Sequence, residues 1–172
     1  PCARAATHLA GAPALTRNRP TRKYDGSIEK FIGDAVVAFF GVPKVHEDDD
    51  VRALKAAREI HSGVNTFGID YEKKTGKRLA FHTGIATGLI VTGEANVDKG
   101  TLVGDTINLA SRLSSIAKPG EILVGEGTYL QSKGTFSFER LQPVSVKGKA
   151  EPVTSYRLLE VKAGPAKGPA AK

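Results

Sequence analysis

Two apolar strand candidates joined by a two-residue turn, with a long amphipathic helix after them, most constrain how this chain folds. Ser27–Ile32 and Ala35–Phe40 are rich in Ile, Val and Phe, and the intervening Gly33-Asp34 is typical of a tight turn between strands. His46-Glu-Asp-Asp-Asp50 then places acidic residues where the positive end of a helix dipole favours them. The expected buried stripe of this helix recurs at spacings of three and four residues, at Val51, Leu54, Ala57, Ile60, His61, Val64 and Phe67.

The alternation of strand and helix patterns repeats in the second half of the chain. Leu79–Gly88 and Leu89–Gly93 predict another pair of strands, and Gly104–Ala117 predicts a second helix. Further short strands are expected at Glu121–Val124, Phe136–Leu141, Val144–Val146 and Val153–Leu159. This order predicts an α+β fold, a ferredoxin-like βαββαβ sandwich with a mainly antiparallel sheet and helices on one face.

The ends of the chain differ in composition from the part between them. Residues 1–23 lack a clear period, and Pro13 and Pro20 are expected to interrupt any helix there, so this segment is predicted to be irregular. Residues 161–172 are rich in Ala, Gly, Pro and Lys and are typical of a linker. The sequence therefore predicts one folded domain over residues 24–160, and a start at Pro1 suggests a piece of something longer.

The positive charge is concentrated at those two ends. Of 25 Lys and Arg residues, five lie in residues 1–23 and three in residues 161–172, which leaves 17 against 18 acidic residues between them. A nearly neutral folded part argues against a nucleic-acid-binding face. The single Cys2 excludes a disulfide framework, and no apolar run is long enough to span a membrane, so a reducing cytoplasm is the expected location.

Asp34 and Lys30 are the first candidates for chemistry. A carboxylate held in a turn at a sheet edge suits Mg²⁺ that bridges phosphates, although a turn Asp also commonly caps its own backbone. Lys30 lies on the same strand face as Ile32 and Asp34 if the strand is regular, and Ile32 is expected to point inward. The alternative for Lys30 is a strand-end lysine whose ammonium reaches solvent.

Asn108 and Arg112 form a second candidate group, because their i, i+4 spacing places them on one helix face. Such a pair is otherwise an ordinary solvated surface. Thr101 precedes this helix and is a candidate only in combination with it. Lys147 lies in a glycine turn between strands, and such a turn is typically solvated. If that turn folds over phosphates, Lys147 supplies a positive charge to them.

Four segments of the chain are informative when they are taken together. They are Ile28-Glu-Lys-Phe-Ile-Gly-Asp34-Ala-Val-Val-Ala-Phe-Phe-Gly41, Thr83-Gly-Ile-Ala-Thr-Gly88, Gly104-Asp-Thr-Ile-Asn-Leu-Ala-Ser-Arg112 and Val146-Lys-Gly-Lys149. In this order they resemble the catalytic domain of the class III adenylyl and guanylyl cyclases. The resemblance runs from about Tyr24 to about Glu160 and is closest to the bacterial soluble-type branch.

The resemblance implies conversion of ATP to 3′,5′-cyclic AMP and pyrophosphate by two-metal catalysis, with two Mg²⁺ or Mn²⁺ ions per site. It implies that Asp34 binds the metals and that Lys30 and Thr101 read the purine, a pair that suits adenine. Asn108 is expected to orient the ribose, Arg112 to stabilise the pentavalent phosphorus and Lys147 to bind the β- and γ-phosphates. The site is expected across a head-to-tail homodimer, with Lys30 and Asp34 from one protomer and the other four residues from its partner.

One feature of the family is not found in this sequence. The family's first metal-binding aspartate belongs on a strand upstream of Lys30, but residues 1–23 hold no Asp or Glu. The first strand and helix of the domain are therefore predicted to be missing or altered, and this chain alone is predicted to be weakly active or inactive. The alternatives are a guanylate cyclase or a non-catalytic cyclase-homology module for dimerisation or sensing. An RNA-binding ferredoxin-like domain fits poorly, because Phe39, Phe40 and Phe81 are interspersed with aliphatic residues as in a core.

Overall fold

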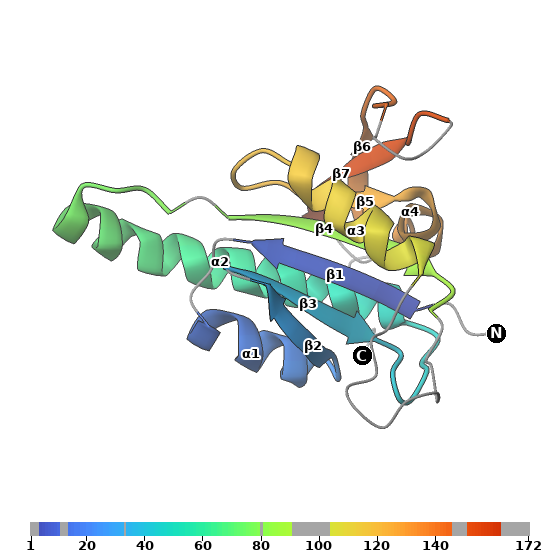
Figure 1. The fold of residues 1–172 in the computed structure, drawn as a ribbon, viewed down its shortest axis with the longest axis horizontal. Coiled ribbons are helices and arrows are strands. Elements are labelled where there is room, and N and C mark those ends of the chain that lie inside the picture. Colours follow the sequence, from blue (N-terminus) through green and yellow to red (C-terminus); the bar gives the residue numbers. More distant parts are fainter. Residues whose placement is uncertain are drawn as a thin grey trace, which may run out of the picture.

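The computed structural model describes residues 4–10, 14–32, 34–79, 81–90, 104–145 and 151–162; for residues 4–10, 14–18 and 30 it describes the backbone. Seven strands and four helices occupy these ranges (Figure 1). None of the helices there combines the length and apolar content needed to cross a bilayer. The elements are β1 (Arg4–Ala10), α1 (Ala14–Lys23), β2 (Ser27–Ile32), β3 (Ala35–Phe40), α2 (Asp49–Thr75), β4 (His82–Gly88), α3 (Asp105–Ile116), β5 (Ile122–Gly125), α4 (Glu126–Ser132), β6 (Phe136–Arg140) and β7 (Ser155–Val161).

The strands form one sheet in the order β2-β3-β1-β4-β5-β7-β6. All neighbouring pairs are antiparallel except β4 and β5, which run parallel. The first six elements, β1-α1-β2-β3-α2-β4, give the strand order and connectivity of a ferredoxin-like unit. The predicted α+β, mainly antiparallel ferredoxin-like fold is therefore confirmed.

The prediction that residues 1–23 are irregular is wrong. β1 lies in the middle of the sheet, where Ala10 is opposite both Ala35 of β3 and His82 of β4. The helix α1 follows, includes Pro20, and packs beside α2 through Lys23 Nζ, which lies 2.7 Å from Glu59 Oε2. The first strand and helix of the domain are thus present, and what this segment lacks is an acidic side chain.

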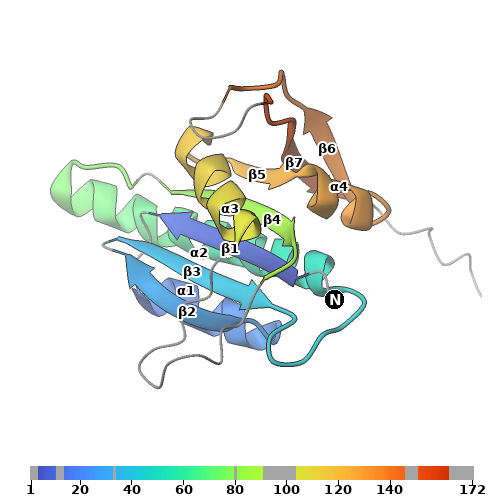
Figure 2. The same cartoon turned by 45° about the vertical axis from the view of Figure 1, so that its right-hand side comes forward.

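The helices occupy both faces of the sheet, which corrects the expectation of helices on one face. β3 is buried along its whole length, with alternate residues in different clusters. Ala38 and Phe40 pack in the cluster that contains Leu54 of α2, whereas Val37 and Phe39 pack in the cluster that contains Leu113 of α3. In Figure 2, α3 lies in front of β1 and β4, while α1 and α2 lie behind the sheet.

Three details differ from the elements expected after β3. Phe67, expected in the buried stripe of α2, is 46% exposed, because α2 runs on past the sheet (Figure 1). Leu89 and Ile90, expected to begin a strand, belong to none, and residues 91–93 lie outside the described ranges. Val144 forms an isolated bridge with Val153 rather than a strand.

Candidate functional site

The position of α3 is determined by its close approach to β4. A Cβ added at Gly84 would overlap the carbonyl oxygen of Ala110 and the backbone nitrogen of Ser114. A Cβ at Gly88 would lie 2.5 Å from the Thr106 hydroxyl, which donates a hydrogen bond to the Leu89 carbonyl at 2.9 Å. The close atoms are backbone atoms of α3 at Gly84 and the Thr106 side chain at Gly88, so the two glycines let α3 lie directly against the strand.

Asn108 and Arg112 lie one helical turn apart on α3, as their spacing predicted. Leu113 and Ala110 of the same helix are buried against the sheet, whereas Asn108 is exposed and Arg112 is half-buried. Within the described ranges, neither polar side chain forms a hydrogen bond or an ion pair. The pair is therefore oriented by the helix and available to a ligand or to a second chain.

Asp34 lies in the turn between β2 and β3, where the residue is exposed and takes part in an interaction within the molecule. Beside it, Phe31 is 53% and Ile32 is 51% exposed, so the expectation that Ile32 points inward is wrong. The reason is that β2 is the edge strand of the sheet. Lys30 is opposite Val37 in the β2–β3 ladder, next to a register shift, and its side chain lies outside what the structure describes.

Within one chain, Asp34 and Asn108 lie toward opposite ends of the sheet. Ala35, directly after Asp34, is level with Ala10 and His82, and His82 contacts Ser114 near the end of α3. The first turn of α3 instead lies over Gly88, near the level of Phe40. Five residues of an antiparallel strand separate these two levels, which is roughly 17 Å. The structure thus brings Asn108 and Arg112 together and leaves Asp34 apart from Asn108.

Two of the predicted site residues cannot be placed in this geometry. Thr101 and Lys147 both lie outside the described residues, in the segments 91–103 and 146–150. Thr101 is close in sequence to the start of α3, and Lys147 lies in sequence between Val144 and Val153, which form a bridge. Their roles therefore stay predictions.

A series of buried polar side-chain contacts lies on the face of β4 that points away from α3. The Thr87 hydroxyl donates to a carboxylate oxygen of Asp50 in the first turn of α2, and lies 2.8 Å from the Thr128 hydroxyl of α4. Asp50 is buried, and this burial raises the pKa of its carboxyl group. These contacts join α2, β4 and α4 at the end of β4 where α3 begins.

His61 provides a second polar contact to the same face. Its Nε2 lies 2.9 Å from the Thr83 hydroxyl, and its ring lies 4.4 Å from that of Phe81. Burial lowers the pKa of His61 to about 4, so the ring is neutral at physiological pH. Neither the Thr87–Asp50 contact nor the His61–Thr83 contact was identified from the sequence. The signal that the sequence offers is the pattern Thr-Gly-Ile-Ala-Thr-Gly over 83–88, in which Thr or Ile alternates with Gly or Ala.

The donors available to a metal ion are few. Within the described part of the chain, no group of three His, Cys, Asp or Glu side chains is arranged to hold a metal ion. Asp34 is an exposed carboxylate at the sheet edge, and β1, which ends beside it, contains no acidic residue. Among the described residues, this donor set fits one Mg²⁺ that takes its other ligands from phosphates and water, and it offers no second carboxylate beside Asp34 on β1.

Comparison with known proteins agrees with this fold. The family model for the adenylate and guanylate cyclase catalytic domain matches residues 19–160. An adenylate cyclase from Anabaena cylindrica is 32% identical over 151 residues, which cover 80% of this chain and 28% of that enzyme. The receptor-type guanylate cyclase gcy-23 from Caenorhabditis elegans is 29% identical, over 80% of this chain and 14% of the relative. The chain therefore spans less than a third of the length of these relatives.

Among solved structures, the adenylyl cyclase CyaB from P. aeruginosa superimposes with a TM-score of 0.83 at 27% identity. The match covers 92% of this chain and 94% of that one. The shared fold therefore takes in most of both chains.

Proposed function

Because this chain belongs to the adenylate and guanylate cyclase catalytic domain family, we propose that it acts on ATP, forming 3′,5′-cyclic AMP and pyrophosphate. In this reaction the ribose 3′ oxygen attacks the α-phosphorus, the bond to the β-phosphate bridging oxygen breaks, and pyrophosphate leaves. The site is proposed to form between two copies of the chain. The whole protein's activity and its cytoplasmic location are part of the same proposal.

The observation that carries the proposal is the Asn108–Arg112 pair on α3. The helix is pressed against β4 at Gly84 and Gly88, so the outward direction of both side chains is determined before any nucleotide binds. A preorganised guanidinium stabilises charge that develops in a transition state, because no reorganisation is needed at the moment of reaction. Arg112 is proposed to act in this way on the pentavalent phosphorus, while Asn108 orients the ribose.

The separation between Asp34 and Asn108 supports a site shared by two chains. A nucleotide held by Asn108 of one copy is proposed to meet Asp34 and Lys30 of the other. Each of the two ends also exposes apolar surface for such an interface. Phe31 and Ile32 are about half exposed beside Asp34, and Leu89 is 63% exposed beside the first turn of α3.

Asp34 is proposed to hold one Mg²⁺ or Mn²⁺ ion together with oxygens of the triphosphate. Such an ion, when bound, lowers the pKa of the 3′ hydroxyl and neutralises phosphate charge. The second carboxylate that the family uses has no counterpart on β1. Turnover is therefore expected to be slow, because a single carboxylate positions less of the metal charge that the reaction needs.

The choice of ATP over GTP depends on Lys30 and Thr101, since the relatives include cyclases of both kinds. An ammonium and a hydroxyl suit the ring nitrogens and amino group of adenine. Lys147 is proposed to bind the β- and γ-phosphates as a point charge.

A second candidate function is a non-catalytic cyclase-homology module that dimerises or senses a nucleotide. The observation that favours it is the absence of an acidic residue from β1, although that strand occupies its place in the sheet. The retention of Asp34, Asn108 and Arg112 favours the catalytic proposal instead, because a module that only dimerises has no need of them.

The test is a direct assay of cyclic nucleotide and pyrophosphate with ATP and with GTP in separate reactions containing Mn²⁺. We expect slow formation of cyclic AMP and still slower formation of cyclic GMP. A preference for GTP would overturn the roles of Lys30 and Thr101. Binding of ATP without any product would establish the sensing module.

A further inference from the structure

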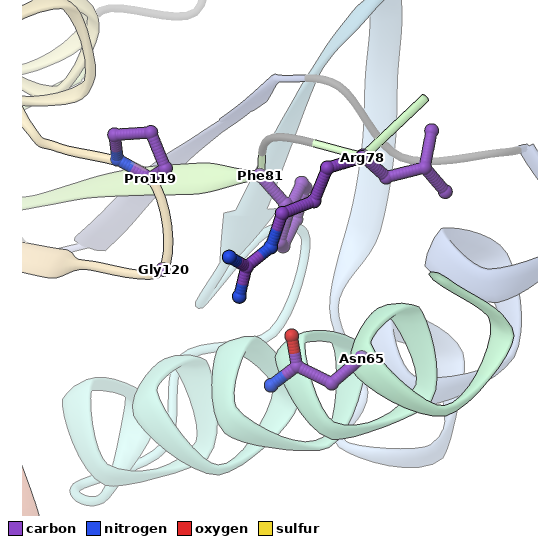
Figure 3. Close-up of a pocket in the computed structure, with 6 residues that line it drawn as sticks. Asn65, Arg78, Phe81, Pro119 and Gly120 are labelled. Atoms are coloured by element: carbon purple, nitrogen blue, oxygen red, sulfur yellow. The ribbon is translucent and has the colours of Figure 1, made fainter. Parts of the chain in front are cut away.

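A cavity of about 380 Å³ lies on the α2 side of the molecule, away from the outward face of α3. It is lined by Asn65 of α2, by Arg78, Leu79 and Phe81 before β4, and by the Pro119-Gly120 turn. Figure 3 shows the Arg78 guanidinium and the Asn65 amide extending into this cavity from opposite sides. None of these residues belongs to the proposed nucleotide site.

The end of α2 places Arg78 over the cavity. Gly76 has φ of 68°, a left-handed conformation that glycine adopts easily, and its N–H donates to the Glu72 carbonyl at 2.8 Å. This cap reverses the chain, so that Arg78 and Leu79 run back beside the helix toward Asn65. The opposite wall is fixed as well, because the Gly120 N–H donates to the Phe81 carbonyl at 2.7 Å.

The charge in the cavity is positive and uncompensated. Its lining includes no acidic residue, and within the described chain Arg78 forms no ion pair or hydrogen bond. Glu72 lines a neighbouring hollow with Arg78, but no ion pair joins them. Glu121, beside Gly120, is already engaged with Arg157 at 2.7 Å and with the Lys118 N–H at 2.9 Å. A guanidinium in this position is suited to a carboxylate or phosphate from outside the chain.

The rest of the lining is apolar. Phe81 is 4% exposed and forms the floor, with Leu79 and Pro119 beside it. Ligand pockets in proteins commonly enclose about 300–1,000 Å³ and combine apolar walls with a few polar groups that orient the ligand. The cavity has this composition, with one cation and one amide at its mouth.

We propose that this cavity binds a small organic anion that has a carboxylate head and an apolar body. The carboxylate would pair with the Arg78 guanidinium, the Asn65 amide would donate to it, and the apolar body would lie against Phe81, Leu79 and Pro119. The Pro119-Gly120 turn begins three residues after the end of α3, so a ligand here contacts the segment that leaves the helix bearing Asn108 and Arg112. The proposal requires no cyclase activity, so it can fail or succeed independently of the proposed function.

The test uses benzoate as the probe, followed by NMR of the backbone amides of Gly120 and of the side-chain amide of Asn65. We expect saturable shifts with benzoate and much weaker shifts with benzamide, which has the same shape without the charge. R78Q should raise the Kd for benzoate about tenfold, because it removes a charge-assisted hydrogen bond.

Arg140→Gln is the matched control, because Arg140 is an exposed arginine on β6 and lines no part of this cavity. This variant should bind benzoate as the unmodified chain does, and the backbone spectra of both variants report whether the fold is intact. Equal binding by R78Q and R140Q, or equal binding of benzamide and benzoate, would overturn the proposal. Tighter binding of inorganic phosphate than of benzoate would overturn the carboxylate assignment and the apolar contact.

Discussion

The two faces of β4 hold their helices in different ways. Gly84, Ala86 and Gly88 face α3 and provide almost no side chain, so the helix lies directly on the strand. Thr83, Ile85 and Thr87 face the α2 side, where Thr83 contacts His61 and Thr87 contacts Asp50. One strand thus fixes α3 mainly by shape, with polar contacts from Thr106 and Ser114 at its two ends, and α2 through buried polar contacts.

This difference predicts how each face responds to change. A contact between backbone atoms and a glycine does not titrate, and it has no room for a methyl group. Buried polar contacts tolerate small changes of shape, but they respond to pH because burial penalises the charged form of His61 and Asp50. The helix that bears the proposed catalytic residues is the one held by shape.

The largest effect is expected from Arg112→Ala. If α3 carries the chemistry, this variant should lower the rate of cyclic AMP formation about a thousandfold, because a preorganised charge that stabilises the transition state is lost. Asn108→Ala should act in the same direction. Arg58→Ala, an exposed arginine on α2, is the matched control and should retain the rate. Equal losses at Arg58 and Arg112 would place the chemistry elsewhere.

Gly84→Ala tests the face held by shape. The added methyl group overlaps backbone atoms of Ala110 and Ser114, so α3 must move, and the free energy of unfolding should fall by about 3 kcal/mol. Gly68→Ala is the control, because nothing lies within 4 Å of its added Cβ in α2. That variant should be more stable by up to about 1 kcal/mol, from its higher helix propensity. Denaturant unfolding measures both, and a harmless Gly84→Ala would refute the close packing.

His61 tests the face held by polar contacts. Its pKa is lowered from 6.5 to about 4, so the unfolded chain binds a proton more readily than the folded chain. Stability should therefore be complete above about pH 6.5 and fall as the pH decreases toward 4, by up to about 3 kcal/mol from this group. Unfolding measured across this range should show a flatter profile for His61→Gln. An unchanged slope in that variant would mean that His61 is not the titrating group.

A smaller effect is expected from Thr87→Val, which removes the hydroxyl that donates to Asp50. The free energy of unfolding at pH 7 should decrease by about 2 kcal/mol, because a buried carboxylate loses a donor. The cost should shrink in acid, where Asp50 is protonated. Thr66→Val, on the exposed side of α2, should change stability by less than about 0.5 kcal/mol. Similar losses of unfolding free energy in Thr87→Val and Thr66→Val would show that the buried contact between Thr87 and Asp50 has no special role.

Strong local patterns made part of the fold predictable from the sequence. β2 and β3 have the predicted bounds, because two apolar runs are separated by a Gly-Asp turn. β1 and α1 were missed, since Arg4–Ala10 consists mostly of small residues and α1 includes Pro20. A central strand of this kind is defined by its neighbours β3 and β4, which a local pattern does not reveal.

The candidate site was likewise predictable from the sequence only where it depends on local geometry. The spacing of Asn108 and Arg112 identified their shared face, because it depends on helix geometry alone. The face of the sheet on which α3 lies depends on Gly84 and Gly88, whose role becomes visible only when strand and helix are packed together. The exposure of Ile32 likewise follows from the edge position of β2, which the sequence did not reveal.

The most direct test of a site shared by two chains is to mix two variants that are each defective in one half. Asp34→Asn and Arg112→Ala should each form almost no cyclic AMP from ATP and Mn²⁺. Random pairing makes half of the dimers mixed, and each mixed dimer has one intact site, so the mixture should recover about a quarter of the unmodified rate. A mixture no more active than the two variants assayed separately would contradict the account.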